Sequence, residues 1–107
     1  MKYQVFLVQD AEDDIFSIYS YISKKDSIAH ASYVYNKLQD ACYSLEHFPF
    51  RGHIPLELNT IDVRGFLQIH FKPYRIIYQV QENKIFIHCV LDGRRELQEL
   101  LQNRLLR

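Results

Sequence analysis

A chain of 107 residues with 48% hydrophobic and 14% aromatic residues has the size and composition of a single folded domain, residues 1–107. The formal net charge of zero argues against strong unassisted binding to nucleic acid, because contacts to phosphate supply most of that affinity. No apolar run approaches the roughly 20 residues of a membrane span, and no basic-then-apolar leader opens the chain. We therefore expect a cytoplasmic protein with no membrane partner.

The first half of the chain predicts a strand and two helices. Residues 3–8 are rich in β-branched and aromatic side chains, typical of a short strand. Asp10 is suited to cap a helix that ends near Lys24 and Lys25, and a second helix begins at Asp26-Ser27. Each helix carries an apolar stripe, formed by Ala11, Ile15, Ile18 and Ile22 in the first and by Ala31, Val34, Leu38, Ala41 and Leu45 in the second. The short connection predicts an antiparallel helical hairpin.

The second half predicts three strands and a helix. The strands are expected at 63–71, with Gly65 as a bulge, at 74–81 and at 85–91. Residues 82–84 form a hairpin turn in which Asn83 suits a left-handed position. In the last strand, alternation places Ile85, Ile87, Cys89 and Leu91 on one face, and Leu97, Leu101 and Leu105 stripe the final helix.

These elements predict an α+β fold. It has an N-terminal strand, an α-helical hairpin packed on an antiparallel-rich sheet of about four strands, and a C-terminal helix. Both faces of the last strand are largely apolar, so we expect both to be covered. The place of the first strand in the sheet stays open.

No pattern in the sequence indicates a metal or a cofactor. Cys42 and Cys89 lie within apolar patterns, which favours buried thiols over a disulfide or a reactive site. Three of the five histidines, His30, His47 and His53, show no metal-ligand spacing with one another or with the cysteines. The sequence also contains no glycine-rich phosphate loop.

The candidate functional residues are arginines and histidines of the second half. Residues 63–107 hold eight Lys or Arg against four Asp or Glu, while residues 1–62 hold five against nine. This asymmetry is typical either of a surface that faces a polyanion or an acidic partner, or of two differently solvated faces. Arg75 interrupts an apolar strand as either a partner-binding guanidinium or a member of an ion pair. Arg94 and Arg95 follow Gly93 and are suited to bind phosphate or carboxylate. His70 and His88 lie on strands and are candidate general acids or bases, although a strand histidine is more often structural.

The whole pattern resembles the RelE/ParE superfamily of toxins from bacterial type II toxin–antitoxin modules. The resemblance lies in the order and spacing of AEDDI (11–15), LEHFP (45–49) with Arg51-Gly52, PYRIIY (73–78) and VLDGRREL (90–97). It implies the same fold and a site in which Arg75 and Arg95 are the arginines of the family motifs. Lysines of RelE-like members would fall near Gln68 and His70, where Lys72 is the only lysine nearby.

The superfamily contains two classes of function. RelE-like members cleave messenger RNA on the ribosome, using arginines, lysines and a tyrosine or histidine near the C-terminus. ParE-like members inhibit DNA gyrase through a protein contact. Residues 96–107 contain no tyrosine or histidine, which favours ParE-like inhibition, with a RelE-like ribosome-dependent mRNA endonuclease as the alternative. The resemblance also implies a cognate antitoxin, whose acidic segment we expect to meet Arg75, Arg94 and Arg95.

Overall fold

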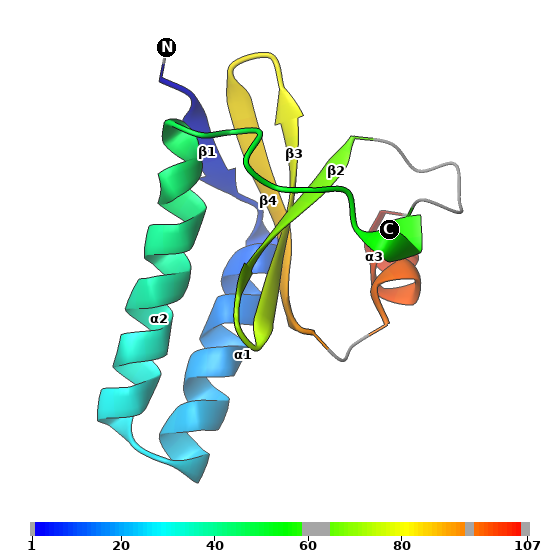
Figure 1. Ribbon diagram of the computed structural model, residues 1–107. Coiled ribbons are helices and arrows are strands. Elements are labelled where there is room, and N and C mark those ends of the chain that lie inside the picture. The colour runs from blue at the N-terminus through cyan, green and yellow to red at the C-terminus, as the bar shows by residue number, and fades with distance from the viewer. Residues whose placement is uncertain (1, 59–64, 94–95, 106–107) are drawn as a thin grey trace.

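The structure, a computed structural model, describes residues 2–58, 65–93 and 96–105 (Figure 1). In chain order its elements are β1 (Gln4–Leu7), α1 (Gln9–Lys25), α2 (Ile28–Tyr43), the 3₁₀ turns η1 (Ser44–Glu46) and η2 (Leu56–Leu58), β2 (Phe66–Phe71), β3 (Tyr74–Gln81), β4 (Lys84–Asp92) and α3 (Leu97–Leu105). This order confirms the predicted α+β class. None of the helices in these ranges is long and apolar enough to cross a membrane.

The two long helices pack as an antiparallel hairpin through the predicted stripes. Their buried positions are Ala11, Ile15 and Ile22 in α1 and Ala31, Val34, Leu38 and Cys42 in α2. The second helix begins at Ile28, directly after the predicted start at Asp26-Ser27, and Ser27 caps it, because its hydroxyl accepts the backbone N–H of His30 at 3.0 Å. The hairpin therefore presents one apolar surface to the sheet.

The start of α1 differs from the prediction. Its N-cap is Val8, whose side chain makes no capping hydrogen bond, and the helix begins at Gln9. Asp10 lies inside the first turn instead, where the helix dipole still stabilises its carboxylate. Its carboxylate lies 4.0 Å from Nε of Arg104 in α3 and forms an ion pair with it.

The four strands form one mixed sheet in the order β1-β4-β3-β2. The β2–β3 and β3–β4 pairs are antiparallel, which confirms the antiparallel-rich sheet. The first strand, which the sequence did not place, lies parallel to β4 at the edge, with Gln4 opposite Lys84 and Leu7 opposite Ile87. This pairing places a strand from the start of the chain beside a strand from its second half.

A β-bulge interrupts the pairing of β3 with β4. Ile77 lies opposite Cys89, whereas the next residue, Tyr78, lies opposite Ile87. His88 is therefore an extra residue in β4, without a direct partner in β3.

The bulge overturns the predicted alternation of β4. Ile85 and Ile87 pack in the core beneath the helical hairpin, as does Val90 after the bulge. Cys89 and Leu91 pack in the core on the opposite face. The prediction placed Ile85, Ile87, Cys89 and Leu91 on one face, because a period of two assumes that no residue is inserted.

Each face of the sheet has its own core, as expected for a sheet covered on both sides. Figure 1 shows α1 and α2 beside each other along one face and α3 at the other. The buried residues on the α3 face are Leu58, Phe66, Ile77, Cys89, Leu91, Leu97 and Leu101. The Leu97 and Leu101 positions of the predicted stripe therefore dock α3 on the sheet.

Cys42 and Cys89 are free, fully buried thiols, which confirms their predicted role. Burial raises the pKa of each thiol to about 12, so neither forms a thiolate near neutral pH.

Two turn predictions need correction. The β3–β4 connection has two residues, and its left-handed residue is Glu82, with φ 58°, not Asn83. The register of Gln81 opposite Lys84 leaves only these two residues, and the twist of the hairpin demands a positive φ at the first. Gly65, with φ 87°, precedes the strand that begins at Phe66 and forms no bulge within it; the predicted start at residues 63–64 lies outside the described residues.

Residues 49–58, which lie between α2 and β2 in the chain, are attached to the sheet, first by Tyr78. The buried hydroxyl of Tyr78 donates to the carbonyl oxygen of Pro49 at 2.8 Å and accepts the N–H of Gly52 at 3.2 Å. Beyond this point His53 forms an antiparallel bridge with Gln68. The sequence predicted only a loop here, yet its path is tied to the sheet.

We expect Tyr78→Phe to lower the free energy of unfolding by about 1–2 kcal/mol, because both backbone groups lose a buried partner. Urea unfolding followed by circular dichroism measures the change. Tyr43→Phe is the matched control, since Tyr43 is 45% exposed and its variant should unfold like the wild type. Equal stability of the two variants would contradict this anchoring role.

Candidate functional site

Arg75 lies on β3, on the face that carries α3, and its side chain is nearly buried. Its Nη1 and Nη2 atoms donate to the two carboxylate oxygens of Glu57 at 2.6 and 2.9 Å. Its Nε atom donates to Oε1 of Gln68 at 2.8 Å. Of the two interpretations of Arg75, the ion pair is the one seen in this structure, and the guanidinium holds the pKa of Glu57 below its usual value through these hydrogen bonds.

A chain of hydrogen bonds continues from Arg75 to a pair of histidines. Because Oε1 of Gln68 accepts from Arg75, its amide nitrogen donates to Nε2 of His53 at 3.0 Å. The His53 ring stacks on His70, with centroids 5.5 Å apart and planes at 25°. This relay couples Glu57 in the loop to the exposed His70 of β2.

The relay forms one wall of a cavity of about 490 Å³. Partial burial lowers the pKa of His70, and its electrostatic interactions with His53, Arg75 and Lys72 lower it further. His70 is thus neutral near pH 7 and able to accept a proton. The cavity, called the Arg75 cavity below, is lined by Leu56, Glu57, Gln68, His70, Lys72, Pro73, Arg75 and Gly93.

The turn after β4 closes the Arg75 cavity. The N–H of Gly93 donates to the carbonyl oxygen of Pro73 at 2.8 Å. A Cβ atom at position 93 would lie 3.1 Å from that oxygen, so glycine permits this close approach. The chemistry of the cavity suits an anion, because Lys72 and Arg75 face it while its own carboxylate, Glu57, is paired.

The structure brings together only some of the predicted residues. Arg75, His70 and Lys72 line the Arg75 cavity. His88, in contrast, is the bulge residue of β4, donates from Nε2 to the amide oxygen of Gln79 at 2.8 Å, and is not among the lining residues. Burial lowers its pKa. Arg94 and Arg95 lie outside the described residues.

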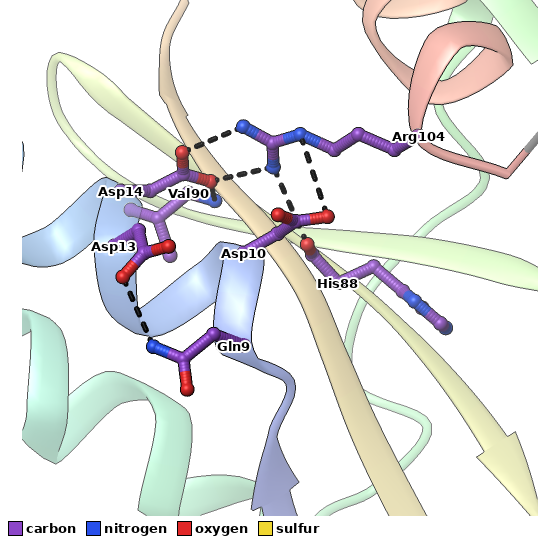
Figure 2. A network of polar contacts seen from close by, with 7 residues as sticks. All are labelled: Gln9, Asp10, Asp13, Asp14, His88, Val90 and Arg104. Carbon is purple, nitrogen blue, oxygen red and sulfur yellow. Dashed lines mark hydrogen bonds and ion pairs between the residues drawn. The ribbon is translucent and has the colours of Figure 1, made fainter. Parts of the chain in front are cut away.

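A second charged network, shown in Figure 2, ties α3 to α1. The guanidinium of Arg104 reaches across β4 and donates to both oxygens of Asp14, at 2.7 and 2.8 Å. Its Nε lies 4.0 Å from Asp10, and the same Asp14 accepts the backbone N–H of Val90 at 2.9 Å. These hydrogen bonds raise the pKa of Arg104, and we call Arg104, Asp14 and Asp10 the Arg104 clasp.

The α3 helix also contacts the Arg75 cavity. The side-chain amide of Gln98 donates to the backbone oxygen of Glu57, the residue that holds Arg75. The helix is therefore fixed near one end to the cavity loop and near the other to α1.

Sequence reasoning missed the partners of these arginines. In the sequence, Glu57 is an acidic residue of an expected loop, and Asp14 is an acidic residue near the start of an expected helix. Neither position alone indicates an arginine partner. A polar Gln68 on a strand face shared with Arg75 was a weak signal for a buried hydrogen bond. Nothing local could connect Arg104 with Asp14, because the pair is 90 residues apart. No group of three metal-ligating side chains occurs in the part of the chain that the structure describes.

The fold and the Arg75 cavity define the class: an α+β domain with a helical hairpin on one face of a mixed sheet and a short helix beside an arginine on the other. Among the solved structures that share this fold are two from toxin–antitoxin systems. One is a chain of the chromosomal ParDE toxin–antitoxin system from P. aeruginosa, with a TM-score of 0.71, 14% identity, and coverage of 85% of this chain and 96% of that chain. The other belongs to the toxin–antitoxin complex RelBE2 of Mycobacterium tuberculosis, with a TM-score of 0.64, 16% identity, and coverage of 86% and 99%.

The family follows from the sequence model. The model for the ParE toxin of the type II toxin–antitoxin system parDE matches residues 5–97. The chain therefore belongs to the ParE toxin family, and the resemblance seen in its sequence is confirmed. No curated protein matches it at a significant level.

Proposed function

We propose that this toxin inhibits growth by binding DNA gyrase, in the cytoplasm, and that a cognate antitoxin neutralises it. The observation that carries the proposal is the engagement of Arg75. Its Nε, Nη1 and Nη2 atoms all donate to side chains of the toxin itself, so an RNA phosphate would have to displace Glu57. A protein contact requires no such displacement.

The sequence of the C-terminal helix supports the same proposal. Residues 96–107 contain no tyrosine or histidine that could transfer a proton to a leaving group. The zero net charge also gives no general attraction to a polyanion such as the ribosome.

Purified toxin should stabilise the cleaved complex of gyrase with DNA. Gyrase, supercoiled plasmid and toxin are incubated, the protein is denatured and digested, and linear plasmid is measured on a gel. We expect linear DNA to rise with toxin concentration. Linear DNA that stays at the toxin-free level at a large excess of toxin would contradict the proposal.

Substitution of the two arginines after Gly93 tests the proposed contact in the same assay. We propose that Arg94 and Arg95, with the exposed Lys72, form the basic surface for gyrase or for an acidic antitoxin segment. Replacing both arginines with glutamate should abolish plasmid linearisation, whereas Lys37→Glu on the exposed side of α2 should leave it unchanged. Full activity of the double variant would place the contact elsewhere.

The RelE-like alternative, ribosome-dependent cleavage of mRNA, rests on the Arg75 cavity. His70 is neutral and shares the cavity with Lys72 and Arg75, so it could take the proton of an attacking 2′-hydroxyl while the cations face the phosphate. Translating ribosomes programmed with a defined mRNA distinguish the two functions. New RNA ends in the A site that disappear with His70→Gln would support cleavage, and their absence would exclude it.

A further inference from the structure

The β1 strand forms one outer edge of the sheet, and in the described part of the chain no strand pairs with its free side (Figure 1). The N–H groups of Gln4 and Val8 donate to carbonyl oxygens in and next to β4, at 2.9 and 3.1 Å. Because the backbone groups of successive strand residues point to opposite sides, those of Val5 and Leu7 point away from β4. The free side of β1 therefore presents two residues whose backbone groups can pair with another strand.

The sequence of β1 lacks the features by which edge strands usually avoid such pairing. Those features are charged side chains, proline, a bulge or a covering segment. Residues 4–7 read QVFL, with neither a charge nor a proline. A neighbouring turn contacts this edge at Tyr3, whose N–H donates to the carbonyl oxygen of Glu46 at 3.0 Å. We therefore expect residues 5–7, beyond this contact, to be open to pairing.

A groove of about 530 Å³ lies along this edge of the sheet. We call it the β1 groove, and it is lined by Lys2, Tyr3, Gln4, Val5, Phe6 and Glu46. Lys2 and Glu46 form an ion pair at 3.3 Å, so the lining has no net charge. A strongly acidic or basic partner gains little from such a surface, whereas a second copy of the chain meets no repulsion there.

Phe6 adds an exposed aromatic ring to this edge. Its neighbours Val5 and Leu7 pack on the core beneath the helical hairpin, so alternation places Phe6 on the opposite face of the sheet. The side chain is 42% exposed, and its ring stacks on that of Phe86 in β4, with centroids 5.6 Å apart and planes at 22°. The exposed part of the ring can take a second aromatic partner.

These constraints select one register for pairing with a second copy about a two-fold axis. When Val5 lies opposite Leu7 of the other copy, the strands pair through their outward-pointing groups, and the N–H of Tyr3 keeps its bond to Glu46. Phe6 then lies opposite Phe6 of the other copy. That position has no direct hydrogen bonds, and facing side chains come closest there.

We propose that the toxin self-associates by antiparallel pairing of β1 with β1 of a second copy. The pairing joins the two sheets into one and places the two Phe6 rings side by side, each stacked on Phe86 of its own chain. Because β1 has only four residues, the association is weak and depends on concentration. The β1 groove is separate from the Arg75 cavity, so this association does not depend on gyrase as the target.

Sedimentation equilibrium of the purified toxin measures the association. The average mass should rise from 12.9 kDa toward twice that value as the concentration increases from about 10 µM to about 1 mM. Phe6→Glu should weaken the association about tenfold, because it removes the aromatic pair and places like charges opposite each other. Phe16→Glu is the matched control on α1, where Phe16 is 66% exposed, and it should associate like the wild type. Circular dichroism shows whether each variant is folded.

Cysteine cross-linking tests the register. Under mild oxidation Phe6→Cys should give a disulfide-linked dimer on a non-reducing gel, because facing Cβ atoms at such a position lie about 4.5–5.5 Å apart. Gln4→Cys is the control and should stay monomeric, since the two copies of position 4 lie about 13 Å apart along the strands. The native Cys42 and Cys89 are buried and give no background. A monomer at every concentration, equal association of Phe6→Glu and wild type, or cross-linking through position 4 and not position 6 would each overturn the proposal.

Discussion

Replacing Asp14 with alanine should lower the free energy of unfolding by about 4 kcal/mol. The change leaves the guanidinium of Arg104, only 18% exposed, without its two-point partner. It also leaves the N–H of Val90 in β4 without its acceptor. Both losses fall on groups that are largely shielded from water, where an unmatched partner is most costly.

Urea unfolding followed by circular dichroism measures the effect, with Asp13→Ala as the matched control. Asp13 is the neighbouring exposed aspartate, and it bonds only the side chain of Gln9 among the contacts shown in Figure 2. The Asp14→Ala, Arg104→Met double variant should recover part of the loss, because no buried charge is then left unpaired. If Asp14→Ala unfolds like Asp13→Ala, the Arg104 clasp contributes nothing to stability.

Glu57→Gln should cost about 3 kcal/mol at neutral pH, since Arg75 is nearly buried and loses the charge that balances it. The effect depends on pH in a defined direction. Arg75 lowers the pKa of Glu57 in the folded state, so the pair's contribution is complete above the pKa of the unfolded carboxyl and is lost as the pH falls through the folded value. The stability gap between wild type and Glu57→Gln should therefore narrow below about pH 4.

Urea unfolding of both proteins between neutral and strongly acidic pH checks this expectation. Glu12→Gln serves as the control, because Glu12 is an exposed residue of the first turn of α1. A gap that stays constant into the acid range would show that the carboxylate charge of Glu57 is not what stabilises the loop.

Much of the scaffold was predictable because it is local. The apolar stripes of α1 and α2 obey the helical period, and the second helix begins next to the predicted Asp26-Ser27. The strand and hairpin positions followed from β-branched runs around short polar turns. Such patterns depend on neighbours within a few residues, which a single sequence displays.

What failed was set by long-range contacts. The bulge at His88 shifts the faces of β4, and it exists only because β3 and β4 pair out of register there. Asp10 does not cap α1 but forms an ion pair with Arg104, near the other end of the chain. In both cases tertiary structure overrode a local preference.

The candidate site shows the same division. The sequence marked Arg75 correctly as unusual, since an arginine in an apolar strand needs a partner. It could not identify Glu57 and Gln68 as those partners, nor show that His70 and not His88 shares the cavity. Those facts follow from the bridge that attaches His53 to Gln68 of β2 and from the insertion of His88 in β4.

The parallel pairing of β1 with β4 also sets the order in which this toxin can be completed during synthesis. The helical hairpin rests on contacts between neighbouring elements and can form early. The first strand cannot pair until residues 84–87 have been made, because Gln4 lies opposite Lys84 in the register. Until β4 is added, the sheet that covers the apolar stripes of the hairpin is incomplete. The strand that is translated first is therefore among the last elements to take its place in the sheet.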